Sequence, residues 1–188
     1  MEKFLGLQLE YLLMLQNFRE VTHGAFDWIL YHITLLGEYC FAMLLVALFY
    51  WVLNKKCGIY LIWNFFGALV VNQFLKVTAC IYRPWILDNR IHPLEKAMKH
   101  ATGYSFPSGH TQSSTSLYSS IAFHFKNAAV YIGAFILIAA VMFSRMYLGC
   151  HTPKDVLVSF AVTIAISLAV SLIYDNFNSS LLTDLLVA

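Results

Sequence analysis

Charged residues are scarce in this sequence. Asp, Glu, Lys and Arg make up 12% of the 188 residues, while 60% are hydrophobic and 16% are aromatic. A soluble core of this size could not bury so much apolar surface, so the composition excludes an ordinary soluble domain and indicates a protein embedded in a bilayer. The formal net charge of +2 is too small, and the basic residues are too dispersed, to indicate a nucleic-acid partner.

Several other signals are also missing. The four cysteines are scattered and include no Cys-x-x-Cys pair, so neither a disulfide framework nor a metal site is indicated. No Pro-, Gly- or Ser-rich linker and no internal repeat divides the chain, and we expect residues 1–188 to form a single domain. Residues 1–20 lack the pattern of a signal peptide, so we expect the N-terminus to be retained.

Long apolar segments predict an all-α, integral-membrane helical bundle. Residues 4–17 alternate apolar and polar side chains at helical spacing, which predicts an interfacial helix at the N-terminus. We expect five spans, or six if the N-terminal segment crosses. The expected spans are 39–53 with a helical stretch at 26–36 before it, 58–82, 111–125, 128–143 and 155–174.

Two segments depart from this apolar pattern. Residues 84–107 contain three prolines and five charged residues, so they predict a long polar loop outside the hydrocarbon. The span 111–125 begins with Thr-Gln-Ser-Ser-Thr-Ser, which would be costly against lipid. We therefore expect its first half to face the interior of the bundle.

A first group of polar residues lies at the end of the span 58–82. Lys76 and Arg83 are seven residues apart, close to two helical turns, so both cations could lie on one side of the helix and bind an anion. Alternatively, Lys76 snorkels to the interface and Arg83 anchors the span near lipid phosphates.

A second group, residues 103–110, reads Gly-Tyr-Ser-Phe-Pro-Ser-Gly-His and opens the next span. Backbone N–H groups at a helix N-terminus, approached closely at Gly109, form a phosphate site. Ser108 could add a hydroxyl donor and His110 a proton. The alternative is an ordinary capped helix start with a structural histidine.

A third group lies between the last two spans. Arg145 is followed by His151 and Asp155, and Thr152-Pro153 predicts an N-cap and first helical residue. A carboxylate four residues beyond a histidine can fix its tautomer and aim the other ring nitrogen as a nucleophile. The alternative is a weak i,i+4 ion pair.

With five spans, all three groups lie at the same membrane face. They then supply cations, helix N–H donors and two histidines, which is the set that phosphoryl transfer requires. The motifs Lys76-x6-Arg83-Pro84, Pro107-Ser108-Gly109-His110 and Ser144-Arg145-x5-His151-x3-Asp155 resemble the signature of the type-2 phosphatidic acid phosphatase superfamily. The resemblance covers residues 76–155 directly and does not cover residues 1–36.

The resemblance implies a role for each matching residue. Substrate phosphate would be bound by Lys76, Arg83, Arg145, Ser108 and the Gly109 N–H. His151 would become phosphorylated, His110 would protonate the leaving group and Asp155 would hold His151. Neither a metal nor another cofactor is implied.

The expected function is hydrolysis of a lipid phosphate or diphosphate, with undecaprenyl diphosphate, phosphatidic acid and phosphatidylglycerol phosphate as candidates. Hydrolysis of a soluble ester, phosphate transfer to another acceptor, and an inactive lipid-binding or transport protein are the alternatives. Lys55, Lys56 and Lys126 fall at the opposite face, so the positive-inside rule predicts that this face is cytoplasmic and that the site faces outside. The expected location is the plasma membrane. Nothing in the sequence indicates an oligomeric state.

Overall fold

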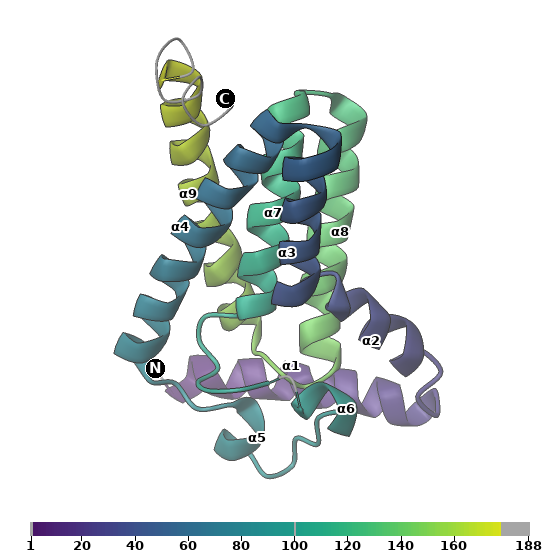
Figure 1. Cartoon of the computed structure of the whole chain (residues 1–188). Helices are drawn as coiled ribbons and strands as arrows, with labels where there is room; N and C mark the ends of the chain where they lie inside the picture. Colours follow the sequence, from purple (N-terminus) through teal and green to yellow (C-terminus); the bar gives the residue numbers. More distant parts are fainter. Residues whose placement is uncertain (1, 100, 178–188) are drawn as a thin grey trace.

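The computed structural model describes residues 2–99 and 101–177, and the regular structure in these ranges is entirely helical. Helices α3, α4, α7, α8 and α9 run along a common axis, whereas α1 lies across one end of them (Figure 1). This confirms the predicted all-α bundle with an interfacial N-terminal helix. The elements are α1 (Glu2–Val21), α2 (Asp27–Leu35), α3 (Tyr39–Leu48), the π-helical turn η1 (Phe49–Leu53), α4 (Lys55–Ala79), α5 (Pro84–Leu87), α6 (Glu95–Met98), α7 (Gly109–Phe125), α8 (Ala128–Tyr147) and α9 (Pro153–Phe177).

The apolar helices are long enough to cross a bilayer. Within the described residues, three segments pass this test by length and composition: Lys55–Leu87, Ala128–Tyr147 and Pro153–Tyr174. A fourth is the pair Asp27–Leu35 and Tyr39–Leu53, which is bent by 51° at the break between α2 and α3. Large side chains such as Leu44, Trp63, Val70 and Phe135 are exposed along these helices, as expected of surfaces that face lipid.

Helix α7 is the polar centre of the bundle. All ten residues from 111 to 120 are buried, which confirms that this half of the helix faces the interior. Asn64 of α4 donates to the Ser116 carbonyl oxygen (3.1 Å), to Ser167 Oγ of α9 (2.9 Å) and to Ser120 Oγ. Because hydrocarbon offers no hydrogen-bond partners, these contacts fix α7 between α4 and α9.

Helix α1 closes the end of the bundle that contains residues 80–99 and 101–107. Its Leu9 and Leu12 are buried in a cluster with Ile91, and Met146 packs against this cluster. Gln16 Nε2 donates to the Arg90 carbonyl oxygen (3.2 Å), and Arg19 Nη2 donates to that of His92 (2.8 Å). The predicted polar loop therefore contains two short helices, α5 and α6, and is held against α1. The predicted domain extends to residue 188, and its last part, 178–188, lies outside the described residues.

Candidate active site

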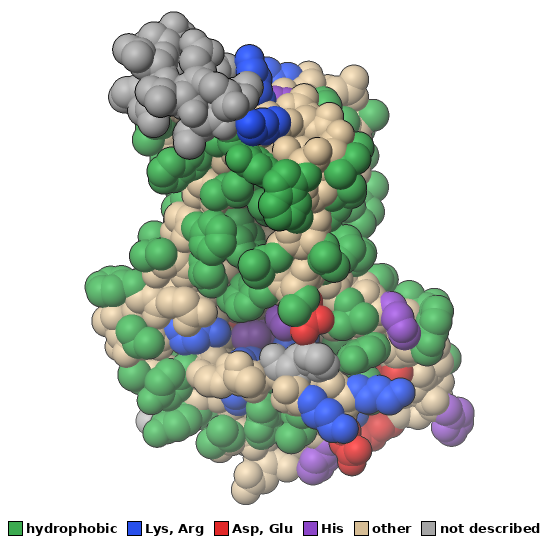
Figure 2. All heavy atoms as spheres, in the orientation of Figure 1, with side chains coloured by type: hydrophobic (Ala, Val, Ile, Leu, Met, Phe, Trp, Pro, Cys, Tyr) green, Lys and Arg blue, Asp and Glu red, His purple; other side chains and the backbone are tan. Residues whose placement is uncertain are grey.

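A cavity of about 320 Å³ lies at the end of the bundle that α1 covers. Figure 2 shows histidine and basic side chains gathered in a hollow below the apolar belt. The lining residues come from segments that are distant in sequence: Gly37, Glu38, Tyr39, Cys40, Gln73, Lys76, Arg83, Thr102, Gly103, Gly109, His110, Arg145 and His151. The structure thus brings the three predicted groups together at one face.

Arg83 reaches this cavity by a route that the sequence did not predict. Helix α4 ends at Ala79, and Cys80 has a left-handed backbone with φ 49°. Arg83 itself is extended, with φ −69° and ψ 151°, as expected for a residue before Pro84. The expectation that Lys76 and Arg83 share one side of a continuous helix is therefore wrong, because the chain turns between them.

The guanidinium of Arg83 forms hydrogen bonds with two separate loops. Its Nε and Nη2 donate to the carbonyl oxygens of Gly103 (3.1 Å) and Thr102 (2.8 Å), and its Nη1 donates to that of Cys150 (3.1 Å). The same Nη1 lies 3.0 Å from His151 Nε2. Arg83 is 4% exposed, so it both shapes the cavity wall and adds positive charge to it.

Arg145 has hydrogen-bond donors that no described residue accepts from. It lies in the last turn of α8, is 1% exposed, and donates from Nη1 to Thr34 Oγ1 (3.1 Å). Its Nε and Nη2 are buried and have no hydrogen-bond partner among the described residues. Because an unsatisfied buried donor is costly, a cationic fork aimed at a cavity indicates an anionic ligand.

His151 is held from one side by a hydroxyl and a carboxylate. Ser105 Oγ lies 3.5 Å from His151 Nδ1 and donates to Asp155 Oδ2 at 2.6 Å. Asp155 Oδ2 is 3.6 Å from the same Nδ1 and also accepts from the Thr152 N–H (2.9 Å). Ser105 therefore supports the predicted pairing of His151 with Asp155.

The other ring nitrogen of His151, Nε2, lies on the side of the cavity. A guanidinium can only donate, so the contact from Arg83 makes Nε2 an acceptor and places the ring proton on Nδ1. Burial lowers the pKa of His151 well below its usual value, and the charges of Arg83, Arg145 and Lys76 lower this pKa further. The imidazole is therefore neutral at neutral pH, with the Nε2 lone pair directed toward Arg83.

The start of α7 forms the wall opposite His151. Ser108 is the N-cap, and its Oγ accepts from the Thr111 N–H (3.4 Å). Ser108 is fully buried and does not line the cavity, so its hydroxyl caps the helix in this structure. Gly109 and His110 do line it, and a Cβ at Gly109 would lie 2.7 Å from Tyr39 Oη, so glycine permits this close approach.

Sequence reasoning assigned no role to four residues around the cavity. Ser105 lies inside the second motif, but only the fold shows that it bridges His151 and Asp155. Glu38, Tyr39 and Gln73 line the cavity from α3 and α4. Glu38 had a detectable signal, since an acidic residue between two apolar helical stretches is a functional candidate by default.

The residues present do not suggest a metal centre. Within 2–99 and 101–177, no group of three or more His, Cys, Asp or Glu side chains is arranged to hold a metal ion. The cavity instead combines three cationic side chains, a helix N-terminus and two histidines. Such a set can bind a phosphoryl group and place a nucleophile and a proton donor next to it.

Two known bacterial proteins have sequences similar to this chain. Undecaprenyl-diphosphatase BcrC of Bacillus subtilis (strain 168) is 29% identical over 148 residues, which are 77% of this chain and 72% of that protein. Phosphatidylglycerophosphatase B of the same strain is 32% identical over 91 residues, 44% of each chain.

A crystal structure shares the fold. It is the transmembrane PAP2 type phosphatidylglycerolphosphate phosphatase from Bacillus subtilis, with a TM-score of 0.74 and 24% identity. The match covers 92% of this chain and 88% of that one. Residues 57–179 match the family profile described as PAP2 superfamily. This integral membrane protein therefore belongs to the PAP2 superfamily.

Proposed function

We propose that this protein is a lipid phosphatase that hydrolyses a phosphate monoester or diphosphate of a membrane lipid through a phosphohistidine on His151. The observation that carries the proposal is the placement of His151 Nε2. It lies on the cavity side, 3.0 Å from Arg83 Nη1, while the opposite ring nitrogen faces Ser105 and Asp155.

The phosphate binds among the three cations. Arg145 contributes the two guanidinium nitrogens that have no partner among the described residues, and Lys76 and Arg83 complete the positive wall. The N–H of Gly109 at the start of α7 adds a backbone donor, and Ser108 supports it by capping the helix. These groups neutralise the equatorial oxygens during transfer, so the reaction needs no metal ion.

In the first step, Nε2 of His151 forms a bond to phosphorus. The bond between phosphorus and the leaving oxygen breaks, and its electron pair stays on that oxygen. The oxygen takes a proton from His110, which lines the same cavity. Asp155 and Ser105 stabilise the proton on Nδ1 as positive charge develops on the ring.

In the second step, water attacks the phosphohistidine. The oxygen of water forms a bond to phosphorus while the phosphorus–nitrogen bond breaks and returns its electron pair to Nε2. His110, now neutral, accepts the proton from the water. Inorganic phosphate leaves, and both histidines regain their starting protonation states.

A lipid is the substrate class that the setting supports. The cavity lies where apolar helices end, and α3 and α4 contribute both cavity-lining residues and exposed apolar surface. A headgroup can therefore reach the cations while its hydrocarbon chain stays in the bilayer. The names of the two curated relatives point to undecaprenyl diphosphate and phosphatidylglycerol phosphate, and phosphatidic acid is a third candidate.

The test is phosphate release by purified protein in detergent with EDTA. The substrates are a short-chain phosphatidic acid, phosphatidylglycerol phosphate, a prenyl diphosphate and glycerol phosphate as the soluble control. We expect phosphate release from at least one lipid to be at least about 100 times faster than release from the soluble ester. The reason is that binding of the lipid chain, away from the reacting phosphate, stabilises the transition state. Release from no lipid would favour a binding protein, and loss of activity in EDTA would contradict metal-independent chemistry.

We also infer that the protein lies in the plasma membrane with the cavity at its outer face. Lys55 and Lys56 begin α4, and Lys126 ends α7, so these lysines directly adjoin spans at the end away from the cavity. The positive-inside rule assigns that end to the cytoplasm. The exposed thiol of Cys80, where α4 ends on the cavity side, can report the orientation.

In a Cys40→Ser variant, we expect a membrane-impermeant maleimide to label Cys80 in intact cells, with no increase after lysis. Cys57 and Cys150 are buried, so the Cys40→Ser/Cys80→Ser variant gives the background. Labelling that requires lysis would place the site inside.

A further inference from the structure

An acidic side chain lines the proposed phosphate site. Glu38 is the one carboxylate among the described residues that line the cavity, and it shares this lining with the cations Lys76, Arg83 and Arg145. A carboxylate in this position repels the phosphate dianion and so weakens substrate binding. Its presence there therefore calls for a role other than binding the phosphate.

The backbone around Glu38 is fitted against the start of α7. A Cβ placed on Gly37 would lie 2.7 Å from the His110 carbonyl oxygen and 2.8 Å from Val141 Cγ1. Tyr118 Oη of α7 donates to the Leu36 carbonyl oxygen at 3.1 Å. The break between α2 and α3 is thus packed directly on the backbone of His110, and Glu38 is the next residue.

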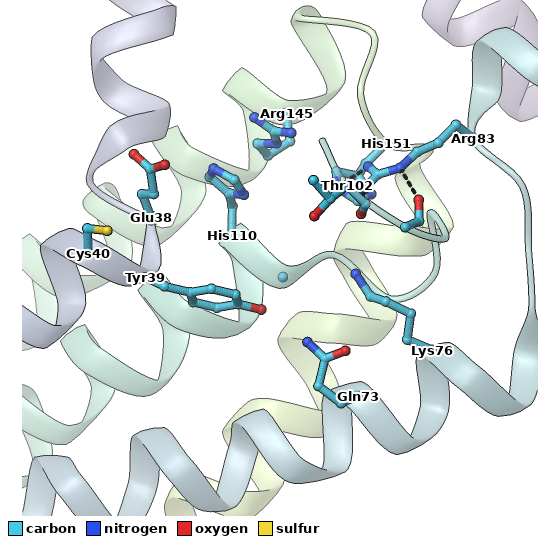
Figure 3. Close-up of a pocket in the computed structure, with 13 residues that line it drawn as sticks. Glu38, Tyr39, Cys40, Gln73, Lys76, Arg83, Thr102, His110, Arg145 and His151 are labelled. Atoms are coloured by element: carbon cyan, nitrogen blue, oxygen red, sulfur yellow. Dashed lines mark hydrogen bonds between the residues drawn. The ribbon is translucent and has the colours of Figure 1, made fainter. Parts of the chain in front are cut away.

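The side chain of Glu38 is turned into the cavity. Glu38 is the N-cap residue of α3, a position where a carboxylate often caps the helix, but its side chain makes no capping hydrogen bond. Figure 3 shows the Glu38 carboxylate and the His110 imidazole on the same side of the cavity, with Arg145 beyond His110. Nε and Nη2 of Arg145 have no hydrogen-bond partner among the described residues, so Glu38 forms no hydrogen bond with either of them.

We propose that Glu38 orients the imidazole of His110 and stabilises its protonated form, and so acts as a positioning residue for the proton donor. The inference rests on the proposed function, in which His110 protonates the leaving oxygen. A cationic imidazole among three other cations is disfavoured, and a neighbouring carboxylate offsets that cost. Glu38 lies outside residues 57–179, so it extends the site beyond the part of the chain that matches the family profile.

The test uses leaving groups of different basicity. The alkoxide of a short-chain phosphatidic acid needs a proton to leave, whereas 4-nitrophenolate leaves without one. We compare kcat/KM, because this ratio reports only the steps up to departure of the leaving group. In Glu38→Gln we expect kcat/KM to fall about 10- to 100-fold for phosphatidic acid, as for weakened general-acid catalysis, and less than about 3-fold for 4-nitrophenyl phosphate.

Three further variants separate positioning from a general structural effect. Glu38→Asp keeps the charge and should recover part of the activity toward phosphatidic acid. In a His110→Ala background, Glu38→Gln should cause no further loss, because the two residues act as one unit. Glu95→Gln is the matched control, since Glu95 is an exposed acidic residue in α6 outside the cavity, and it should behave like the parent.

The pH profile gives a second readout. The ionisable groups that share the cavity with His110 are Glu38, Tyr39, Cys40, Lys76, Arg83, Arg145 and His151. Removing the carboxylate leaves mainly cations around His110, so its proton is lost more easily. The alkaline limb of kcat/KM for phosphatidic acid should move to lower pH in Glu38→Gln and stay in place in Glu95→Gln.

The outcomes distinguish this inference from the proposed function. The role of Glu38 would be overturned if Glu38→Gln lowered kcat/KM equally for both substrates, or if its loss were additive with that of His110→Ala. Either result would leave the proton-donor role of His110 in place. A His110→Ala variant that loses equal activity on both substrates would remove the proton-donor role itself, and the inference with it. For each variant, an elution profile and a thermal unfolding curve that match those of the parent exclude misfolding as the cause of lost activity.

Discussion

Replacing His151 with alanine is expected to abolish phosphate release, by a factor of at least about 1,000, while the bundle remains folded. The variant removes the proposed nucleophile, and general-acid catalysis and substrate binding alone recover only a small part of the rate. In a second measurement, the parent turns over a lipid that carries a radioactive phosphate, and the reaction is quenched. The parent protein should then retain radioactive label that is lost in acid and survives in alkali. The variant should retain none.

An exposed histidine on the same end of the molecule gives the control. His92 is exposed, and its contacts with Gln16 and Arg19 use its backbone, so His92→Ala should keep full activity. If His151→Ala turned over lipid at a rate near that of the parent, His151 could not be the nucleophile. Label on a different residue of the parent would lead to the same conclusion.

The second largest effect is expected at Arg145. Arg145→Ala should lower kcat/KM by about 100- to 1,000-fold, as is usual when one preorganised donor to a developing charge is removed. The reason is its pair of buried guanidinium nitrogens that have no partner among the described residues. Arg145→Lys should restore little activity, because a single ammonium cannot reproduce the two-nitrogen fork. The measurement is kcat/KM for the best lipid substrate, together with inhibition by orthovanadate, a mimic of phosphate. Inhibition should weaken in parallel with the fall in kcat/KM.

Arg90 offers a matched control for that variant. It is an exposed arginine that pairs with Glu10 (2.9 Å) and Asp88 (2.8 Å) on the same end of the molecule. Arg90→Gln should leave both kcat/KM and vanadate inhibition near the parent values. An Arg145→Ala enzyme with unchanged vanadate inhibition would show that Arg145 does not bind the phosphate.

The sequence was informative where function depends on residue type and spacing. Apolar segments predicted the bundle, and the placement of Thr152 and Pro153 predicted the start of α9, where the Asp155 N–H donates to Thr152 Oγ1 (3.3 Å). The three motifs predicted that Lys76, His110 and His151 would meet. Local patterns suffice for these features because each depends on helix period or capping chemistry.

Features that depend on tertiary packing were not predictable in this way. The seven-residue spacing between Lys76 and Arg83 suggested a continuous helix, but the chain turns at Cys80 and Arg83 is instead held by carbonyl oxygens of two remote loops. Likewise, no local pattern reveals that Ser105 contacts Asp155, fifty positions later. Glu38 joins the cavity only because the break after α2 packs against α7.

The polar character of α7 bears on how the protein is assembled. A helix whose first half contains six consecutive hydroxyl and amide side chains, at residues 111–116, would insert poorly by itself, since each polar residue disfavours transfer from the translocon to lipid. Its partners lie on α4, which is synthesised earlier, and on α9, which is synthesised later; Ser119 Oγ, for example, donates to Ser167 Oγ at 2.9 Å. Helix α7 is therefore fully partnered only after Ser167 has left the ribosome. Biogenesis thus couples the cavity residues on α7 to the synthesis of α9. A nascent chain that stops before α9 carries the His110 motif on a helix that the bilayer does not accommodate.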